Sequence, residues 1–197
     1  KTQQRLNVKV LSFKKAKDIL PYGHEIFELI NVAYKDLYNV VPLTEAQIEF
    51  YIKQYFSSIN PDFIKLVVDK DGKLAAFGIG IPSLGKALIE TRGKLVPFGF
   101  LKLLKALKKN DSVDLLLVAV RPDMQNKGVN SLLMTSFAEA CWKNGIKTAY
   151  CNPELETNFK VQGQWKHFPT TQHKKRRCYL KKLSPAGQAD MTDSNIN

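Results

Sequence analysis

The stretch "DLLLVAVRPDMQNKGVNSLLMTSF", residues 114–137, decides the fold, because it runs from a strand into a helix through one short turn. The segment from Asp114 to Val120 is apolar after its first residue, which predicts a strand in the middle of a sheet. Beyond the turn, helical spacing predicts a helix over 129–144 that stops at Gly145. Its apolar positions are Val129, Leu132, Leu133, Phe137, Ala140 and Cys141.

The turn itself, "QNKGVN" at 125–130, has the composition of an anion site. The first turn of a helix leaves backbone N–H groups unpaired and carries a partial positive charge. Gly128 allows a phosphate to approach the backbone, Lys127 adds a full charge, and Gln125 and Asn126 add donors. On the turn alone, a plain connection between strand and helix fits equally well, because short glycine motifs are common.

Apolar spacing elsewhere predicts the remaining elements. Helices are expected at 24–38, 42–56 and 158–168, the second opened by a capping box of Thr44 and Gln47. The expected strands lie at 5–13, at 63–81 as a hairpin around Asp71-Gly72, at 146–152 and at 176–183. This order predicts the α/β class: a mixed sheet, mostly antiparallel and then parallel, flanked by helices.

Residues 82–110 are expected to form a helical insert, with a helix over 97–109. One face of that helix carries Lys102, Lys105 and Lys109, opposite part of a leucine face. Such a face is usually solvated. Two alternatives remain open, namely recognition of an acidic substrate and contact with a membrane surface.

Length and composition favour one globular domain over 1–183, with a disordered polar tail at 184–197. The chain begins at Lys1, so a piece of a longer protein is expected. No uninterrupted apolar stretch is long enough for a membrane span, and no signal peptide is visible. Three scattered cysteines and three scattered histidines predict reduced thiols in a cytoplasmic protein, with no structural zinc site and no other metal.

The net charge of +12 attracts acidic partners, which include nucleic acid, anionic lipid and small phosphorylated ligands. The densest basic run is "HKKRRCYLKK" at 173–182. It lacks a recognisable nucleic-acid-binding motif, so no specific nucleic-acid partner is expected.

Residues 125–130 resemble the signature of the GNAT superfamily of acyl-CoA N-acyltransferases, Gln/Arg-x-x-Gly-x-Gly/Ala. The sixth position departs, because Asn130 replaces a small residue. The resemblance implies that the central strand splays from its neighbour and that the backbone of Val118 and Val120 pairs with the pantetheine arm of acetyl-CoA. The residues implied to cradle the pyrophosphate are Gln125, Asn126, Lys127, Gly128, Val129 and Asn130.

A second family motif, Asn-x-x-Ala-x-x-x-Tyr, resembles residues 158–165. Asn158 matches its asparagine, whereas Trp165 stands where the family usually has the tyrosine that protonates the leaving thiolate. An indole is a poor acid, so the usual general acid is in doubt. Asp114 stands at an offset from Gln125 where some members hold a catalytic glutamate. A relaying water would be needed, since aspartate is shorter. His167 is a second candidate base.

The resemblance implies an N-acyltransferase that moves an acetyl or other acyl group from acyl-CoA to a small-molecule or peptide amine, within a ternary complex. Two alternatives remain open. One is a basic nucleic-acid-binding module, which the charge favours. The other is a catalytically weak domain that binds coenzyme inside a larger protein, which the missing tyrosine favours.

Overall fold

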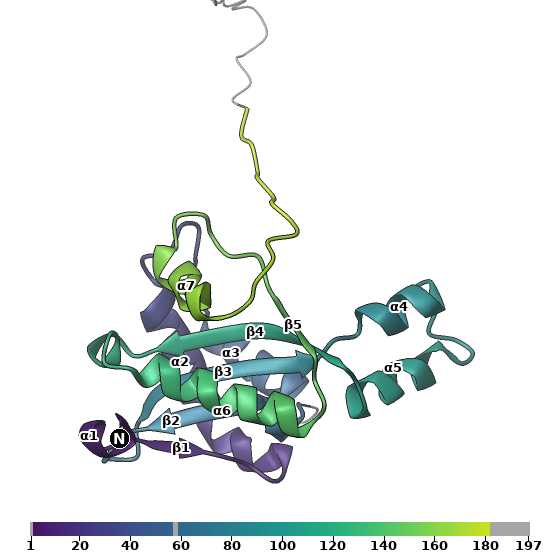
Figure 1. Ribbon diagram of the computed structural model, residues 1–197. Helices are drawn as coiled ribbons and strands as arrows, with labels where there is room; N and C mark the ends of the chain where they lie inside the picture. The colour runs from purple at the N-terminus through teal and green to yellow at the C-terminus, as the bar shows by residue number, and fades with distance from the viewer. Residues whose placement is uncertain (1, 57–58, 182–197) are drawn as a thin grey trace, which may run out of the picture. The chain divides into compact units, whose positions relative to one another are not determined.

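A computed structural model describes residues 2–56 and 59–181 of the chain. These residues fall into two compact units, Lys1–Phe159 and Lys160–Asn197. The first unit is built around one sheet in the order β1-β2-β3-β4-β5 (Figure 1). The strands are β1 (Lys9–Leu11), β2 (Ile64–Val68), β3 (Leu74–Pro82), β4 (Ser112–Val120) and β5 (Thr148–Cys151).

The pairing confirms the predicted mixed sheet. The three pairs from β1 to β4 are antiparallel, and β4 pairs with β5 in parallel. The predicted hairpin around Asp71-Gly72 joins β2 to β3, and Asp69 fixes it by accepting the backbone N–H groups of Asp71 and Lys73, each at 3.0 Å. The apolar strand at 114–120 is central, as predicted, between β3 and β5.

Helices cover both faces of the sheet. On one face, α2 (Gly23–Tyr34) and α3 (Glu45–Tyr55) bury a core with the sheet residues Ile64, Leu66, Phe77, Ile79 and Ala119. On the other face, α6 (Val129–Lys143) packs Val129 and Leu133 against a core from β1, β2 and β3. The predicted capping box opens α3, with the Thr44 N–H donating to Gln47 Oε1 at 2.9 Å. The division into two buried cores follows from the alternation of side chains along each strand.

The insert between β3 and β4 contains two helices, α4 (Gly85–Thr91) and α5 (Gly99–Lys108). Only α5 was predicted. In Figure 1 both helices extend away from the end of the sheet. A 3-10 helix at Ala16–Tyr22 and single 3-10 turns at Pro61–Phe63 and Pro122–Met124 complete the unit.

Several predicted element boundaries were wrong. The strand expected at 5–13 is limited to β1, and the residues before it form α1 (Thr2–Leu6). Asn7 separates the two elements with a φ of +48°, a left-handed conformation that ends a helix. The helix expected over 24–38 stops at Tyr34.

The second unit holds short helical turns, namely the end of α7 (Phe159–Gly163) and the 3-10 turn Gln164–His167. Trp165 packs edge-on against Phe168, with ring centroids 6.1 Å apart. The strand predicted at 176–183 was wrong for residues 176–181, which form no strand. Residues 174–177 are four consecutive cations, so a strand there would have no apolar face to bury. Residues 182 and 183 and the predicted disordered tail at 184–197 lie outside the described residues.

Two further observations bear on the composition. All three cysteines lie in the described part of the chain, and all are free thiols. Burial raises the pKa of Cys141 to about 11, so this thiol stays protonated near neutral pH.

Among the described helices, none has the length and apolar character that crossing a bilayer requires.

Candidate functional site

The central strand β4 loses its parallel partner halfway along its length. Pairing with β5 runs from Ser112↔Thr148 to Leu115↔Cys151 and then stops. A register shift in the pairing with β3 lies at the same level, between Ile79 and Gly80. One edge of β4 is therefore unpaired from Leu116 to Val120, over roughly 13 Å at the usual rise per residue. The predicted splay is present at this position.

Side chains, instead of a strand, meet the backbone along this edge. The carbonyls of Leu116, Val118 and Val120 accept from Asn152 Nδ2 at 3.4 Å, Tyr34 Oη at 2.8 Å and Gln125 Nε2 at 3.1 Å. Alternate residues of a strand direct their backbone groups to the same edge. Asn152 directly follows β5, so all three carbonyls face the side that β5 has left. We call residues 116–120 the open edge.

The open edge is apolar but incompletely covered. Leu115, Leu116, Val118 and Val120 are half-buried, and Leu117 is 36% exposed. A fully buried central strand would be the ordinary outcome for such a sequence. Apolar side chains beside available carbonyls suit an extended ligand that carries both methylene groups and amides.

The predicted anion turn follows the open edge after Arg121 and the 3-10 turn Pro122–Met124. Asn126 and Gly128 have φ values of +59° and +90°, and Gly128 immediately precedes α6. Residues in the left-handed region direct successive backbone N–H groups toward one point, which is the geometry of an anion-binding concavity. The fifteen residues of α6 add the positive end of a helix dipole.

Arg121 fixes the approach to this turn. Its guanidinium contacts Asp69 Oδ2 at 2.8 Å and Asp123 Oδ1 at 2.7 Å, and donates to the Leu74 carbonyl at 3.2 Å. Burial opposes ionisation of Asp69, but hydrogen bonds from Arg121 and the hairpin amides outweigh it and lower its pKa. The hydrogen bond from Arg121 lowers the pKa of Asp123 as well. This network joins the turn to the β2–β3 hairpin.

Within the turn, the predicted residues occupy different positions. The side-chain amide of Gln125 holds the end of β4, as described above. The Val129 side chain is buried, so only its backbone faces the turn. Asn126 and Lys127 are exposed, and Asn130 is half-buried.

The sequence did not predict that α1 contacts the turn. Arg5 Nη2 donates to the Lys127 carbonyl at 2.8 Å, and Thr2 Cγ2 would lie 3.4 Å from a Cβ placed on Gly128. A second cation therefore stands beside Lys127. Because we predicted a strand over 5–13, the prediction included no helix that could bring Arg5 to the turn.

Tyr34 is the other residue that the sequence analysis missed. It lies in α2, and its hydroxyl reaches Val118 in the middle of the open edge. Burial raises its pKa, although the hydrogen bond to Val118 opposes the increase. The signal was present in the sequence, because Tyr34 follows the inward-facing Ile30 by four residues.

The remaining predicted residues lie around the same strand or beyond it. Asp114 is half-buried in β4, between Ile81 of β3 and Tyr150 of β5, two residues before the open edge begins. Asn158 donates its N–H to Leu155 in the loop after β5. Trp165 belongs to the second unit. Its predicted place beside the coenzyme stays a prediction.

A separate cleft of about 800 Å³ lies toward the other end of α6. Its lining mixes Lys65, Lys14 and Lys143 with Asp62 and Glu139. Burial lowers the pKa of Lys65, and Lys143 lies 3.7 Å from Asp62. The mixture of signs does not suit a polyphosphate, and the cleft is distant along α6 from the anion turn.

His24 meets two carboxylates on α3. Its Nδ1 lies 3.1 Å from Glu45 and its Nε2 lies 3.1 Å from Glu49. Both ring nitrogens thus have separate partners, and all three side chains are at least 47% exposed. The arrangement is that of an exposed histidine between two acids.

Two curated proteins resemble the chain. Protein YghO of Escherichia coli is 25% identical over 162 residues, which cover 79% of this chain and 41% of that protein. Bacterial ceramide synthase of Caulobacter vibrioides is 26% identical over 175 residues, covering 84% of this chain and 45% of that protein. The chain therefore spans less than half the length of these relatives.

Solved acetyltransferases share the fold. AAC(6')-Iy, solved in complex with the bisubstrate analog CoA-S-monomethyl-acetylneamine, superposes with a TM-score of 0.52 at 11% identity. The superposition covers 89% of this chain and 99% of that one. The acetyltransferase (GNAT) family also matches this sequence directly, over residues 24–167. With the splayed sheet, the open edge and the glycine turn before α6, this match places the chain in the GNAT family of acetyltransferases.

Proposed function

We propose that the chain transfers an acyl group from acyl-CoA, with acetyl-CoA as the first candidate, to an amine. The observation that carries this proposal is the open edge of β4, followed through one short 3-10 turn by the anion turn. An extended apolar arm that ends in a pyrophosphate needs these two features in this order. We extend the same proposal, acyl transfer to an amine, to any longer protein that contains this chain.

The coenzyme would lie along β4. Pantetheine amides would donate to the carbonyls of Val118 and Val120, which can accept a second hydrogen bond because a carbonyl oxygen has two lone pairs. The pyrophosphate would meet the amides of residues 126–130. Lys127 and Arg5 would supply positive charge there, and Asn158 and Trp165 would border the arm.

Direct transfer requires a neutral amine. The nitrogen lone pair attacks the thioester carbonyl, a C–N bond forms, the C–S bond breaks, and the sulfur leaves as a thiolate. Asp114, through a relaying water, would take the proton that the amine loses. Tyr34 would return a proton to the thiolate, because its hydroxyl lies on the open edge, at Val118.

The names of two similar proteins bear on the acceptor class. One relative is a ceramide synthase by name, and the solved AAC(6')-Iy complex carries an acetylated neamine analog. We favour a long-chain amine as the acceptor. The reason is that the resemblance to the ceramide synthase covers more than four fifths of this chain.

The test is a direct assay of thiol release from acetyl-CoA and from a long-chain acyl-CoA. Each donor would be offered a polyamine, a peptide with a free N-terminus and a long-chain amino alcohol. We expect thiol release that depends on one acceptor and falls at least tenfold in Asp114→Asn. Coenzyme binding without release for any acceptor would favour the catalytically weak alternative.

The nucleic-acid alternative rests only on net charge. A binder of that kind would lose affinity steeply as salt rises. We expect weak and sequence-independent binding, and selective binding at physiological salt would reverse our ranking.

A further inference from the structure

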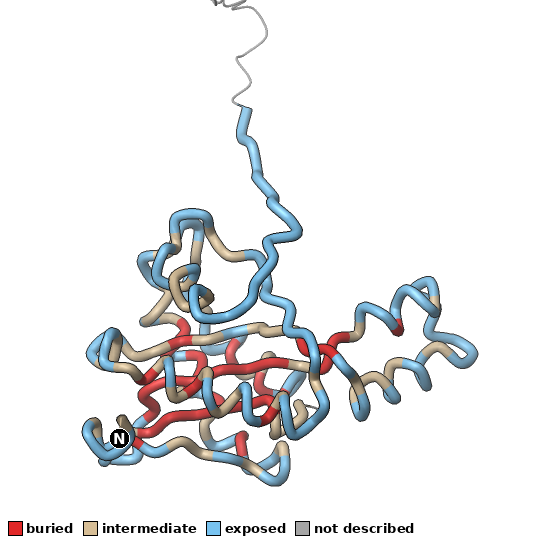
Figure 2. The backbone as a smooth tube through the Cα atoms, viewed as in Figure 1, coloured by how far each residue is buried: buried red, intermediate tan, exposed pale blue. Residues whose placement is uncertain are grey.

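The insert between β3 and β4 presents apolar side chains with nothing packed on them. Phe98 is 72% exposed, Val96 82% and Ile89 79%. In Figure 2 the insert is drawn almost entirely in pale blue and tan, whereas β3, which leads into it, is largely red. We call the exposed apolar set the insert tip. Its members are Leu88, Ile89, Leu95, Val96, Phe98, Phe100, Leu101 and Leu104.

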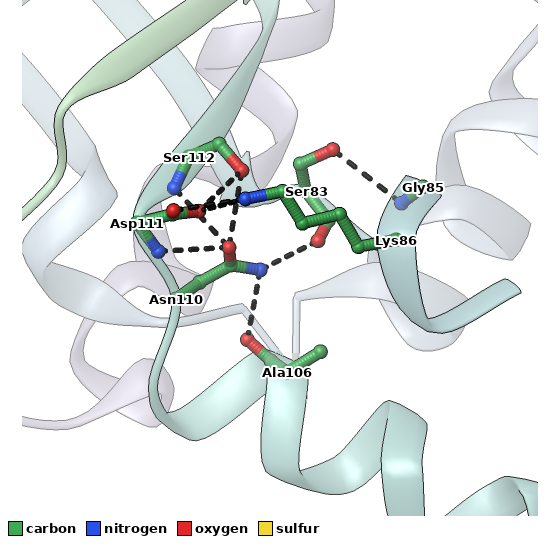
Figure 3. Close-up of polar contacts among 7 residues, drawn as sticks. All are labelled: Ser83, Gly85, Lys86, Ala106, Asn110, Asp111 and Ser112. Carbon is green, nitrogen blue, oxygen red and sulfur yellow. Dashed lines mark hydrogen bonds and ion pairs between the residues drawn. The ribbon is translucent and has the colours of Figure 1, made fainter. Parts of the chain in front are cut away.

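The base of the insert is held firmly. Asn110 donates to the carbonyls of Ser83 and Ala106, and its Oδ1 accepts from the backbone N–H groups of Asp111 and Ser112 at 2.9 and 3.1 Å (Figure 3). Lys86 Nζ contacts both Asp111 carboxylate oxygens, at 2.9 and 2.8 Å. Both ends of the insert are thereby joined to the start of β4.

The tip itself is also an ordered structure. Phe100 donates its N–H to the Leu95 carbonyl at 2.9 Å, and Gly93 donates to Leu88 at 3.0 Å. A methyl group on Gly99 would overlap the carbonyl oxygen of Lys94, so the loop packs directly on the start of α5. The apolar residues are therefore displayed by a defined loop and helix. A protein does not normally display contiguous apolar surface without a function for it.

Positive charge surrounds this apolar surface. Residues 85–109 contain seven lysines and arginines and one acid, Glu90. Lys102 contacts Glu90 at 3.2 Å, and Lys86 contacts Asp111. Within the residues that the structure describes, the other five cations form no ion pair. They are Arg92, Lys94, Lys105, Lys108 and Lys109.

The charged and apolar residues are interleaved on α5. Lys105 follows Leu101 by four residues, and Lys108 follows Leu104 by four, so each lysine is a helical neighbour of an exposed leucine. Lysine side chains can direct their ends toward polar headgroups while an adjacent apolar side enters the boundary beneath.

We infer that the insert tip docks on the surface of an anionic lipid bilayer. Its unpaired cations match acidic headgroups, and Phe98, Val96 and Leu101 enter the boundary below them. A second copy of the chain would bring the same excess of positive charge against itself. The inference goes beyond the proposed function and holds whether or not the chain transfers an acyl group.

This docking would also orient the acyltransferase site. The insert joins β4 three residues before Asp114, whereas the anion turn follows the opposite end of that strand. A bilayer at the insert would face the Asp114 end and leave the coenzyme turn in water. An amine with a long chain would then arrive from the membrane side.

The experiment is vesicle co-sedimentation of the full chain. Vesicles of phosphatidylcholine alone are compared with vesicles that also contain phosphatidylglycerol, at low and high salt. We expect partition into the anionic vesicles that weakens with salt. Each cation near an anionic surface contributes about 1 kcal/mol, which is about fivefold in partition. Lys105→Gln with Lys108→Gln should therefore reduce partition at least tenfold, and Phe98→Ser with Leu101→Ser should do the same.

Matched controls remove equal charge or equal apolar surface elsewhere. Lys70→Gln with Lys147→Gln removes two exposed cations, and Trp142→Ser removes an aromatic side chain that is 87% exposed on α6. Both should change partition less than about twofold. Equal losses in controls and insert variants, or no partition into anionic vesicles, would overturn the inference. So would a dimer in analytical ultracentrifugation that Phe98→Ser with Leu101→Ser dissociates, because a second copy would then occupy the tip.

Failure of docking and failure of the proposed function can be told apart. Acetyl-CoA affinity is measured on the same variants without vesicles. We expect it to be unchanged, because none of the substituted residues lies at the open edge or the anion turn. A loss of coenzyme affinity in the insert variants would show that the substitutions disturb the fold, and would count against reading their vesicle data as docking.

Discussion

Replacing Gly128 by alanine tests the anion turn. Gly128 has a φ of +90°, and a non-glycine residue in left-handed backbone costs about 1–2 kcal/mol. The new methyl group would lie 3.4 Å from Thr2 Cγ2, which is ordinary contact, so no clash adds to this strain. For a domain of this size the melting temperature should fall by roughly 2–8 °C.

Gly145 supplies the matched control at the other end of α6. Its φ is +71°, and a methyl group there would meet no atom within 4 Å. Gly145→Ala should therefore lose a similar amount of stability through the same backbone strain. Only Gly128→Ala should also weaken acetyl-CoA binding, by at least tenfold in isothermal titration calorimetry, because its methyl group stands where the phosphate must approach. Equal dissociation constants in the two variants would refute the placement of the pyrophosphate at this turn.

Three further predictions concern single groups. Tyr34→Phe should leave coenzyme affinity within a few fold but lower kcat by roughly a hundredfold, if this hydroxyl is the general acid; an unchanged kcat with a working acceptor would remove it from the mechanism. Trp165→Ala should weaken coenzyme binding, whereas Trp165→Tyr should keep binding and a similar or higher kcat; a tyrosine variant that binds but has no turnover would contradict our view of the indole as an apolar wall. The lowered pKa values of Asp69 and Asp123 imply stability that is present above their ordinary values of about 3.9 and is lost as pH falls through the lowered ones. Urea unfolding between pH 7 and 3 should therefore show a smaller acid loss in Asp69→Asn than in the parent, and parallel curves would contradict the role of the Arg121 network.

Periodicity predicted the parts of the fold in which one local signal dominates. The capping box of Thr44 and Gln47, the hairpin at Asp71-Gly72 and the strand–turn–helix at 114–144 each have such a signal, and the structure contains all three. The strand expected at 176–183 rested on a short apolar run, Cys178 to Leu180, between basic residues. Its described residues, 176–181, form no strand.

The contacts that assemble the candidate site could not be predicted in the same way. Tyr34 and Val118 are 84 residues apart, and Arg5 and Lys127 are 122 residues apart. No local pattern encodes such pairs. The exposure of the insert tip could not be predicted from the sequence either, because it also depends on residues distant in the chain. The pattern of leucines on α5 predicts an amphipathic helix, but only the three-dimensional arrangement establishes that Leu101 and Leu104 remain half exposed.

Hydrogen–deuterium exchange of the chain with and without acetyl-CoA tests the central claim most directly. The account predicts that the coenzyme slows amide exchange in two segments, the open edge at 116–120 and the anion turn at 125–130. Exchange in the insert at 85–108 should remain unchanged. Protection centred on the cleft around Lys65 and Lys143, or no protection at saturating acetyl-CoA, would contradict the placement of the coenzyme along β4.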